Sequence, residues 1–172
     1  MAKTVIGIDP GKGGGIAQYK KGFASAVAMP ENVKRLNEYL IQLRDNNPEI
    51  VVFVEKVQAF VEDDEVGGLK FGINKLLAQF EQIKTVLIIN DIPFIEVHPK
   101  TWQSPLNLPK GLSSMERKNL YKQFAQQHFP EAKVNLKTAD ALCIMYFGLQ
   151  KLITDIHWIN QKIIEFKSEG FF

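Results

Sequence analysis

The first thirty residues alternate short apolar runs with turn-forming residues. Residues 3–9 and 14–19 are rich in β-forming side chains and are separated by a glycine-rich turn. A third apolar run, at 23–29, follows after one more turn. Short runs with this spacing are typical of hairpins. We therefore expect an antiparallel meander of three strands.

A helix and a buried strand are predicted next. Between Pro30 and Pro48 the chain carries one apolar stripe at helical spacing, formed by Val33, Leu36, Leu40 and Leu43. The segment 49–57 is apolar almost throughout, which is typical of a strand buried on both faces of a sheet with parallel pairing. Because a crossover helix separates them, strands 3–9 and 49–57 should run parallel.

The remaining pattern is mainly helical. We expect a long helix at about 69–90, a short strand at 94–97, a proline-rich loop, a basic helix at about 113–128 and a core helix at 139–152. The sequence thus predicts an α/β fold in residues 1–152, with a central mixed five-stranded sheet flanked by helices. Residues 153–172 are expected to form an amphipathic helical tail.

The expected helix at 69–90 is unusually apolar. Its main stripe and further apolar positions surround more of the helix than one core contact needs. A second subunit would cover the excess, which favours a homodimer.

Composition indicates a soluble protein of a reducing compartment. The chain has 172 residues, of which 45% are hydrophobic, enough for one domain with a core. Cys143 is the single cysteine, which excludes an internal disulfide and a Cys-rich metal site. The sequence has neither a signal-peptide pattern nor an apolar run of the roughly 18 residues that a membrane helix needs. We expect a cytoplasmic protein of a bacterial or phage-infected cell, without membrane contact.

Charge is unevenly distributed along the chain, although the net charge is only +2. Residues 98–139 contain seven basic and two acidic side chains, so this segment carries +5 and the remainder −3. Such a division suits a protein that neutralises a polyanion at one surface and holds cations at another. An ordinary solvated helix face is the simpler explanation of the same run.

Three acids lie among apolar or small neighbours: Asp9, Glu55 and Asp140. A carboxylate in such a place needs a cation or a hydrogen-bond donor. Mg²⁺ binds through one or two carboxylates and keeps several waters, so three acids suffice for a pair of ions that hydrolyses a phosphodiester. Simpler explanations exist: a turn beginning at Asp9, a surface salt bridge of Glu55, and a helix-dipole contact of Asp140.

The chain resembles the RuvC family of Holliday junction resolvases, especially its phage-encoded and organellar members. The similarity is carried by GIDPGKGGGIA, VVFVEKV, FIEVHPKTW and TADALCIMYFG, with the basic stretch ERKNLYKQFAQQHFP before the last, and spans residues 3–150. It implies a ribonuclease H-like fold, a homodimer, two Mg²⁺ or Mn²⁺ ions per site and no nucleotide cofactor. The implied activity is paired nicking of branched DNA, such as four-way junctions, leaving 5′-phosphates and 3′-hydroxyls.

The resemblance also assigns residues. By position, Asp9, Glu55 and Asp140 match the metal-binding catalytic acids, and Lys118 matches a lysine of the active site. An exposed helix lysine is the alternative for Lys118. Phosphate contacts, which position DNA without reading its sequence, are expected from three further basic residues. These are Lys100, Arg117 and Lys122.

The chain departs from the family pattern in three places, the third being the four acids at 61–68 in the loop expected to face DNA. Where the family has a further acid or a His shortly before the last Asp, this chain has Leu136 and Lys137. Lys137 should therefore either weaken the second metal site while attracting the scissile phosphate, or turn outward to a neighbouring phosphate. Gln58 falls at the position of the family's junction-wedging aromatic, and Phe60, two residues later, is the candidate wedge.

For the remaining residues of interest, we expect structural rather than catalytic roles. The four acids of 61–68 are read as a solvated loop, with an extra cation site as the alternative. Trp102 and His98 are read as loop-packing residues and Cys143 as core.

Three other functions stay open. A related ribonuclease H-like nuclease acting on RNA or flaps would share all three acids. A catalytically weak junction-binding module would result if the missing fourth ligand prevented metal binding. An ATP-binding protein of the actin and sugar-kinase group opens with a similar Asp-Gly turn, but needs two such domains.

Overall fold

The computed structural model describes residues 4–58 and 67–168, except for the side chains of 67–71 and 166. Within these ranges, one mixed sheet contains β1 (Thr4–Asp9), β2 (Gly15–Lys20), β3 (Phe23–Ala28), β4 (Ile50–Glu55) and β5 (Phe94–Val97). The strand order is β3-β2-β1-β4-β5. The first three strands pair antiparallel, whereas β4 pairs in parallel with β1 and β5. The predicted meander and parallel crossover are confirmed.

The main helices lie where the apolar periodicity places them. They are α1 (Val33–Asp45), α2 (Gly67–Ile89), α4 (Ser114–His128) and α5 (Ala139–Thr154), and α6 (Ile156–Ser168) follows within the expected tail. The proline-rich segment is not a loop throughout, because it contains α3 (Pro99–Gln103) and a 3-10 turn, η1 (Ser104–Leu106). Pro99 suits the first turn of a helix, where its missing N–H is not needed. None of the described helices is long and apolar enough to cross a membrane.

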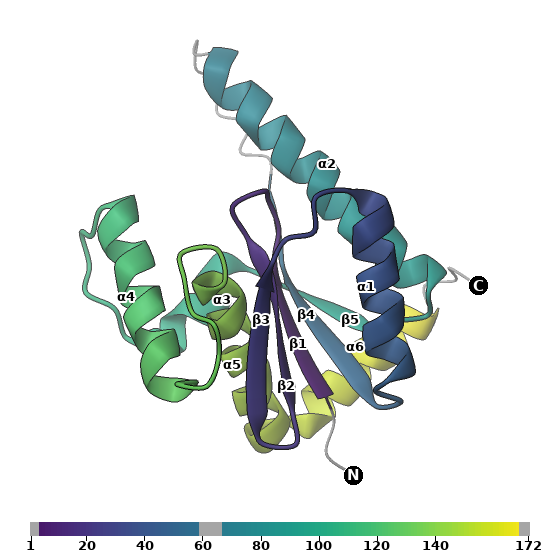
Figure 1. Cartoon of the computed structure of the whole chain (residues 1–172). Coiled ribbons are helices and arrows are strands. Elements are labelled where there is room, and N and C mark those ends of the chain that lie inside the picture. The colour runs from purple at the N-terminus through teal and green to yellow at the C-terminus, as the bar shows by residue number, and fades with distance from the viewer. Residues whose placement is uncertain (1–3, 59–66, 169–172) are drawn as a thin grey trace.

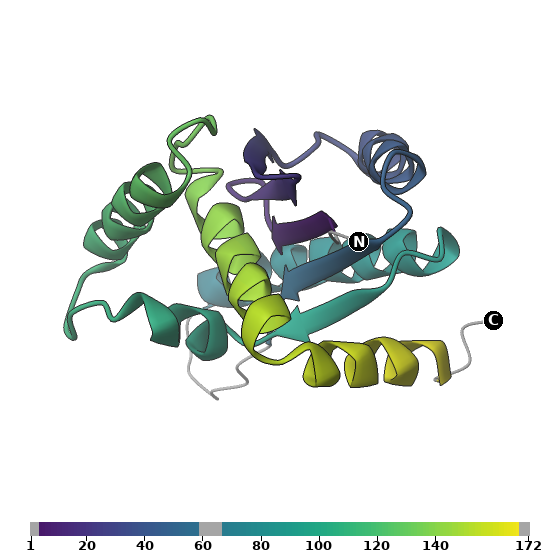
Figure 2. The same cartoon turned by 90° about the horizontal axis from the view of Figure 1, so that it is seen from below.

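The sheet separates two hydrophobic cores. Helices α1 and α2 cover one face, and α5 lies across the other with α3, α4 and α6 beside it (Figures 1 and 2). Strand side chains alternate between the two, so Ile6 and Ile8 pack toward α1 and α2, whereas Val5 packs with α5. Cys143 is fully buried in the second core, as predicted.

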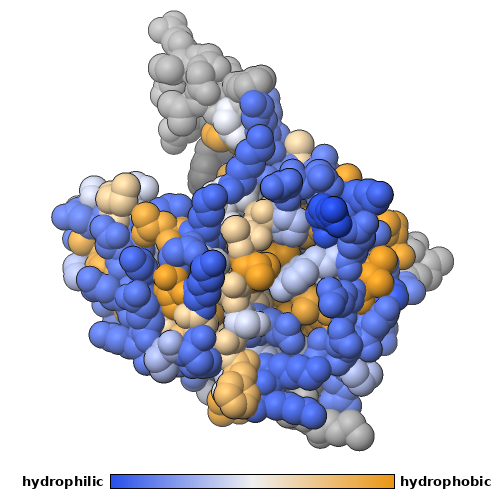
Figure 3. Space-filling model, viewed as in Figure 1, coloured by the Kyte–Doolittle hydropathy of each residue, from blue (hydrophilic) through white to orange (hydrophobic). Residues whose placement is uncertain are grey.

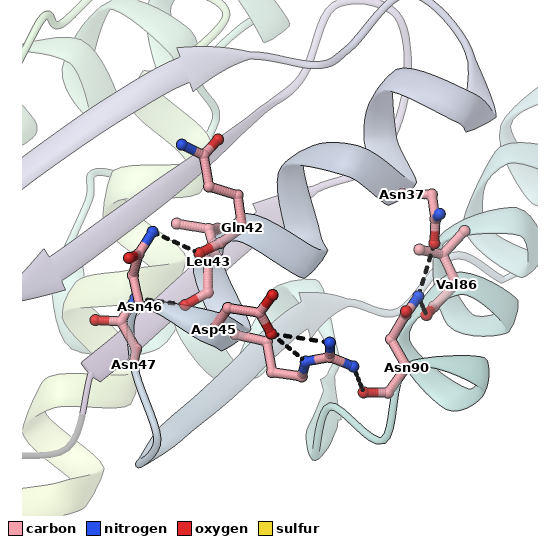
Figure 4. Close-up of polar contacts among 9 residues, drawn as sticks. Asn37, Gln42, Leu43, Asp45, Asn46, Asn47, Val86 and Asn90 are labelled. Atoms are coloured by element: carbon pink, nitrogen blue, oxygen red, sulfur yellow. Dashed lines mark hydrogen bonds and ion pairs between the residues drawn. The ribbon is translucent and has the colours of Figure 1, made fainter.

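Polar contacts fix α1 at the end of the sheet opposite Asp9. Asn90, just after α2, donates from Nδ2 to Asn37 Oδ1 at 2.7 Å, and its carbonyl accepts from Arg44 at 3.1 Å (Figure 4). Asn47 Nδ2 donates to the Leu43 carbonyl at the end of α1, and Thr4 Oγ1 donates to Asn47 Oδ1 at 3.0 Å. Helix α1, which lies between β1 and β4 in the chain, is therefore held both to the end of α2 and to the start of β1.

Helix α5 lies directly against β1 because Gly7 has no side chain. A Cβ on Gly7 would lie 2.3 Å from the Ala141 carbonyl oxygen and 2.4 Å from the Met145 nitrogen. Gly148 makes a similar approach, since its Cβ would lie 2.6 Å from the ring of Phe53 on β4. These contacts place the first turn of α5, with Asp140, beside the carboxyl end of β1.

Helix α2 extends past the sheet. Its first half projects from the rest of the molecule (Figure 1), and its buried residues Phe80, Ile83, Val86 and Leu87 all belong to its second half. Ile73, Leu76 and Leu77 of the projecting half are half-buried. The expected cover by a second subunit stays a prediction.

Candidate active site

Asp9 and Glu55 end two neighbouring parallel strands, β1 and β4. Both carboxylates therefore lie at the same edge of the sheet. Asp140, in the first turn of α5, joins them from the adjoining face. All three residues are partly buried. The structure thus brings together the three acids that the sequence singles out.

The turn after β1 explains why this stretch is rich in glycine. Gly11 has a φ of 111°, in the region that favours glycine, and its carbonyl accepts from the Gly14 N–H at 3.0 Å. A Cβ on Gly14 would lie 2.1 Å from the Asp9 carbonyl oxygen. The chain thus folds back closely over Asp9, which leaves little solvent around its carboxylate.

Burial and mutual repulsion disfavour the ionised form of these acids. Burial raises the pKa of Asp9 well above its usual value, and the charges of Asp140 and Glu55 raise it further. Burial also raises the pKa of Asp140. For Glu55, burial raises the pKa to about 7 despite an opposing hydrogen bond from Trp102. Three acids in this state form a site that a cation would stabilise.

Lys118 supplies the positive charge that reaches this site. This half-buried residue lies on α4, and its charge lowers the pKa of Asp9, Glu55 and Asp140 alike. Helix α4 begins with a capping box, in which Ser113 and Glu116 exchange hydrogen bonds. The cap fixes the first turn of α4, directly before Lys118.

The other expected DNA contacts lie farther out on the surface. Lys100, Arg117 and Lys137 are exposed, and Lys122 is half-buried. In the space-filling view the outer surface of α4 is mainly hydrophilic (Figure 3). Phe60 and the acids of 61–66 lie outside the described residues.

Trp102 is the site residue that the sequence analysis missed. Its side chain is only 1% exposed, as a packing residue should be, but its Nε1 also donates to Glu55 Oε2 at 2.7 Å. A buried indole N–H normally finds an acceptor, and that requirement was the available signal. The packing interpretation was wrong for His98, which is exposed, with Nε2 lying 3.2 Å from Gln58 Nε2.

The donor set fits a hard divalent cation. Asp140 Oδ1 and Tyr121 Oη are buried without a hydrogen-bond partner within the described structure. Among residues 4–58 and 67–168, no three His, Cys, Asp or Glu side chains converge tightly enough to ligate one metal ion. Mg²⁺ commonly takes only one or two carboxylates and fills its other positions with water. Ligation by two of these acids, with water in the other positions, would meet that requirement.

The strand order and the parallel crossover define an α/β fold of the ribonuclease H-like type. The structure is similar to that of RuvC from Thermus thermophilus. One RuvC structure, in complex with a Holliday junction substrate, matches with a TM-score of 0.56 and 17% identity over 90% of this chain and 97% of that one. Another gives a TM-score of 0.55 and 18% identity over 87% and 95% of the two chains. The expected fold is thereby confirmed.

The yeast mitochondrial Holliday junction resolvase Ydc2 is more distant, with a TM-score of 0.36 and 13% identity over 83% of this chain and 74% of that one. No protein-family model matches the sequence, and no curated protein matches it either.

Proposed function

We propose that this protein is a metal-dependent endonuclease that nicks Holliday junctions and related branched DNA. The observation that carries the proposal is the meeting of Asp9, Glu55 and Asp140 with Lys118 at one edge of a RuvC-like sheet. The Holliday junction bound to the similar RuvC supports branched DNA as the substrate.

The three carboxylates would hold Mg²⁺ or Mn²⁺, in our proposal two ions per site. Such ions, when bound, activate a water nucleophile and stabilise the attacking and leaving oxygens of the phosphodiester. The protein contributes three carboxyl side chains from β1, β4 and α5, so these elements set their spacing before DNA arrives. Because these side chains are partly buried, few water molecules surround the carboxylates.

Lys118 would bind the phosphate at the cut, because it is the cation whose charge reaches the carboxylates. The exposed cations Lys100, Arg117 and Lys137 and the half-buried Lys122 would bind flanking phosphates and set the salt dependence of binding. Because these contacts read the backbone, we expect selection of DNA by its branched shape.

A homodimer completes the proposal. Two symmetric nicks in a four-way junction need two copies of one site, which a two-fold dimer supplies. The projecting half of α2, with half-buried Ile73, Leu76 and Leu77, offers a surface for it. Sedimentation that showed only monomers, both free at micromolar concentration and on junction DNA, would contradict this part.

The test is cleavage of a four-way junction, a flap and an RNA–DNA hybrid side by side with Mg²⁺ or Mn²⁺. We expect paired nicks in the junction and loss of all cleavage in an Asp140→Asn control. Faster cleavage of the hybrid or the flap would transfer the protein to the alternative nuclease class. Junction binding without any cleavage would identify a binding module instead.

A further inference from the structure

The indole of Trp102 makes a short, directed contact with one oxygen of Glu55. The separation of Nε1 and Oε2 is 2.7 Å, within the range of strong hydrogen bonds to carboxylates. An indole N–H can only donate, and it donates once, so this bond takes one lone pair of Oε2 and leaves the lone pairs of Oε1 untouched.

Trp102 is held in place by its surroundings. It lies on α3, which starts directly after β5, the strand paired in parallel with β4. Its side chain is buried in the core against Tyr121, with 5.2 Å between the ring centroids. The indole is therefore a rigid donor whose position is set by the same sheet that carries Glu55.

The backbone next to Glu55 is independently fixed. The Lys56 N–H donates to the Val97 carbonyl at 2.8 Å, and Lys56 Nζ pairs with Glu96 at 3.0 Å. Ionic contact continues to α2, where Lys84 Nζ lies 2.9 Å from the other oxygen of Glu96. With the backbone fixed, Glu55 can still rotate about its side-chain bonds, and the hydrogen bond from Trp102 restricts this rotation.

We propose that Trp102 is a positioning residue whose indole N–H holds Glu55 Oε2, so that Glu55 binds the divalent cation through its other oxygen. This inference rests on the proposed function. Removing a donor that orients a metal ligand typically weakens metal affinity about 10–100-fold.

The test compares Mn²⁺ binding, measured by calorimetry on the full chain without DNA, in three proteins. They are the wild type, Trp102→Phe, and the matched control Trp158→Phe. Trp158 is the other tryptophan of the chain, half-buried on α6, with Lys151 Nζ 5.3 Å from its ring. We expect Mn²⁺ affinity to fall at least about tenfold in Trp102→Phe and to stay unchanged in Trp158→Phe.

A second variant separates the N–H from the ring. Incorporation of 3-benzothienylalanine at position 102 keeps the bicyclic shape and replaces the N–H by sulfur. The same loss of Mn²⁺ affinity in this protein, with unchanged circular dichroism, would support a role of the hydrogen bond itself. Unchanged affinity in this protein would overturn the inference while leaving the proposed nuclease intact. A wild type that binds no Mn²⁺ would overturn both.

Discussion

The carbonyl oxygen of Lys137 lies 2.7 Å from the position that a Cβ on Gly15 would occupy. The backbone of the segment before α5 is thereby pressed against β2, while the Lys137 side chain is exposed. Its N–H donates to Asn135 Oδ1 at 2.8 Å, which fixes this turn. The exposed side chain of Lys137 agrees with the outward expectation, and Lys118 is the lysine whose charge lowers the pKa of the three acids.

Neutralising Lys118 should therefore affect the rate of cleavage, whereas neutralising Lys137 should affect DNA binding. Lys118→Gln should slow single-turnover junction cleavage at least about tenfold, because it removes a preorganised positive group. Lys137→Gln should leave the rate at saturating DNA unchanged and reduce the slope of log affinity against log salt by about one. Quenched-flow cleavage and binding titrations at several salt concentrations measure both effects.

Lys34→Gln, an exposed position on α1, is the control and should alter neither quantity. Lys137→Asp should also leave the Mg²⁺ requirement for half-maximal cleavage unchanged. A lower requirement in that variant would show instead that Lys137 acts on the metal site.

Conservative changes of the three acids should separate chemistry from binding. Asp9→Asn, Glu55→Gln and Asp140→Asn each remove a ligand charge and keep the side-chain volume. We expect cleavage to fall at least about 100-fold in each, with junction affinity in the absence of metal retained. Gel cleavage assays and mobility shifts provide the measurements. Near-wild-type nicking by any variant would remove that residue from the site.

The stability of the metal-free protein should fall as the pH rises from about 4.5 to 7. Burial raises the pKa of Glu55 from 4.5 to about 7, so in this interval the folded protein keeps a proton that the unfolded chain has lost. Asp9 and Asp140 act in the same direction. At neutral pH and above, the raised pKa of Glu55 lowers the free energy of unfolding by about 3 kcal/mol.

Urea unfolding at a series of pH values measures this effect. Glu55→Gln should flatten the decline, whereas Glu31→Gln, at an exposed position, should not. Added Mg²⁺ should restore stability above pH 7, because it favours the ionised acids. A protein that became more stable over this pH interval would contradict the assignment of Glu55 as a buried acid.

Gly7→Ala should destabilise the protein by about 3 kcal/mol, because the new methyl group meets the backbone of α5. Gly72→Ala is the matched control, since a Cβ there has no neighbour within 4 Å. That exchange, within a helix, should stabilise by up to about 1 kcal/mol. Thermal unfolding of both variants provides the measurement. Equal melting temperatures would mean that α5 moves away from β1 without cost.

Much of the fold could be predicted from the sequence, because apolar periodicity indicates helices and strands and a helical crossover implies parallel strand pairing. The alternation and continuous apolar runs predicted β1 to β4, and parallel pairing then placed Asp9 beside Glu55. The approach of Asp140 depends on Gly7. A glycine within a strand indicates a bulge, a bend or the close approach of another backbone, and the sequence pattern does not distinguish these cases. Helix α3 is too short to show a period, so the hydrogen bond from Trp102 was not foreseen. Whether Lys118 or Lys137 reaches the acids depends on the path of the turn before α5, which the sequence pattern does not predict.

During synthesis, Asp9 and Glu55 leave the ribosome long before Asp140. The contact of α5 with Gly7 cannot form until the chain has been made well past residue 140, because the docked part of the helix extends to Gly148. A polypeptide that ends before residue 140 lacks one of the three carboxylates, and one that ends before Met145 lacks part of the contact that docks α5 on Gly7. The proposed DNA-cutting site would therefore be complete only after α5 has been synthesised and has docked on β1.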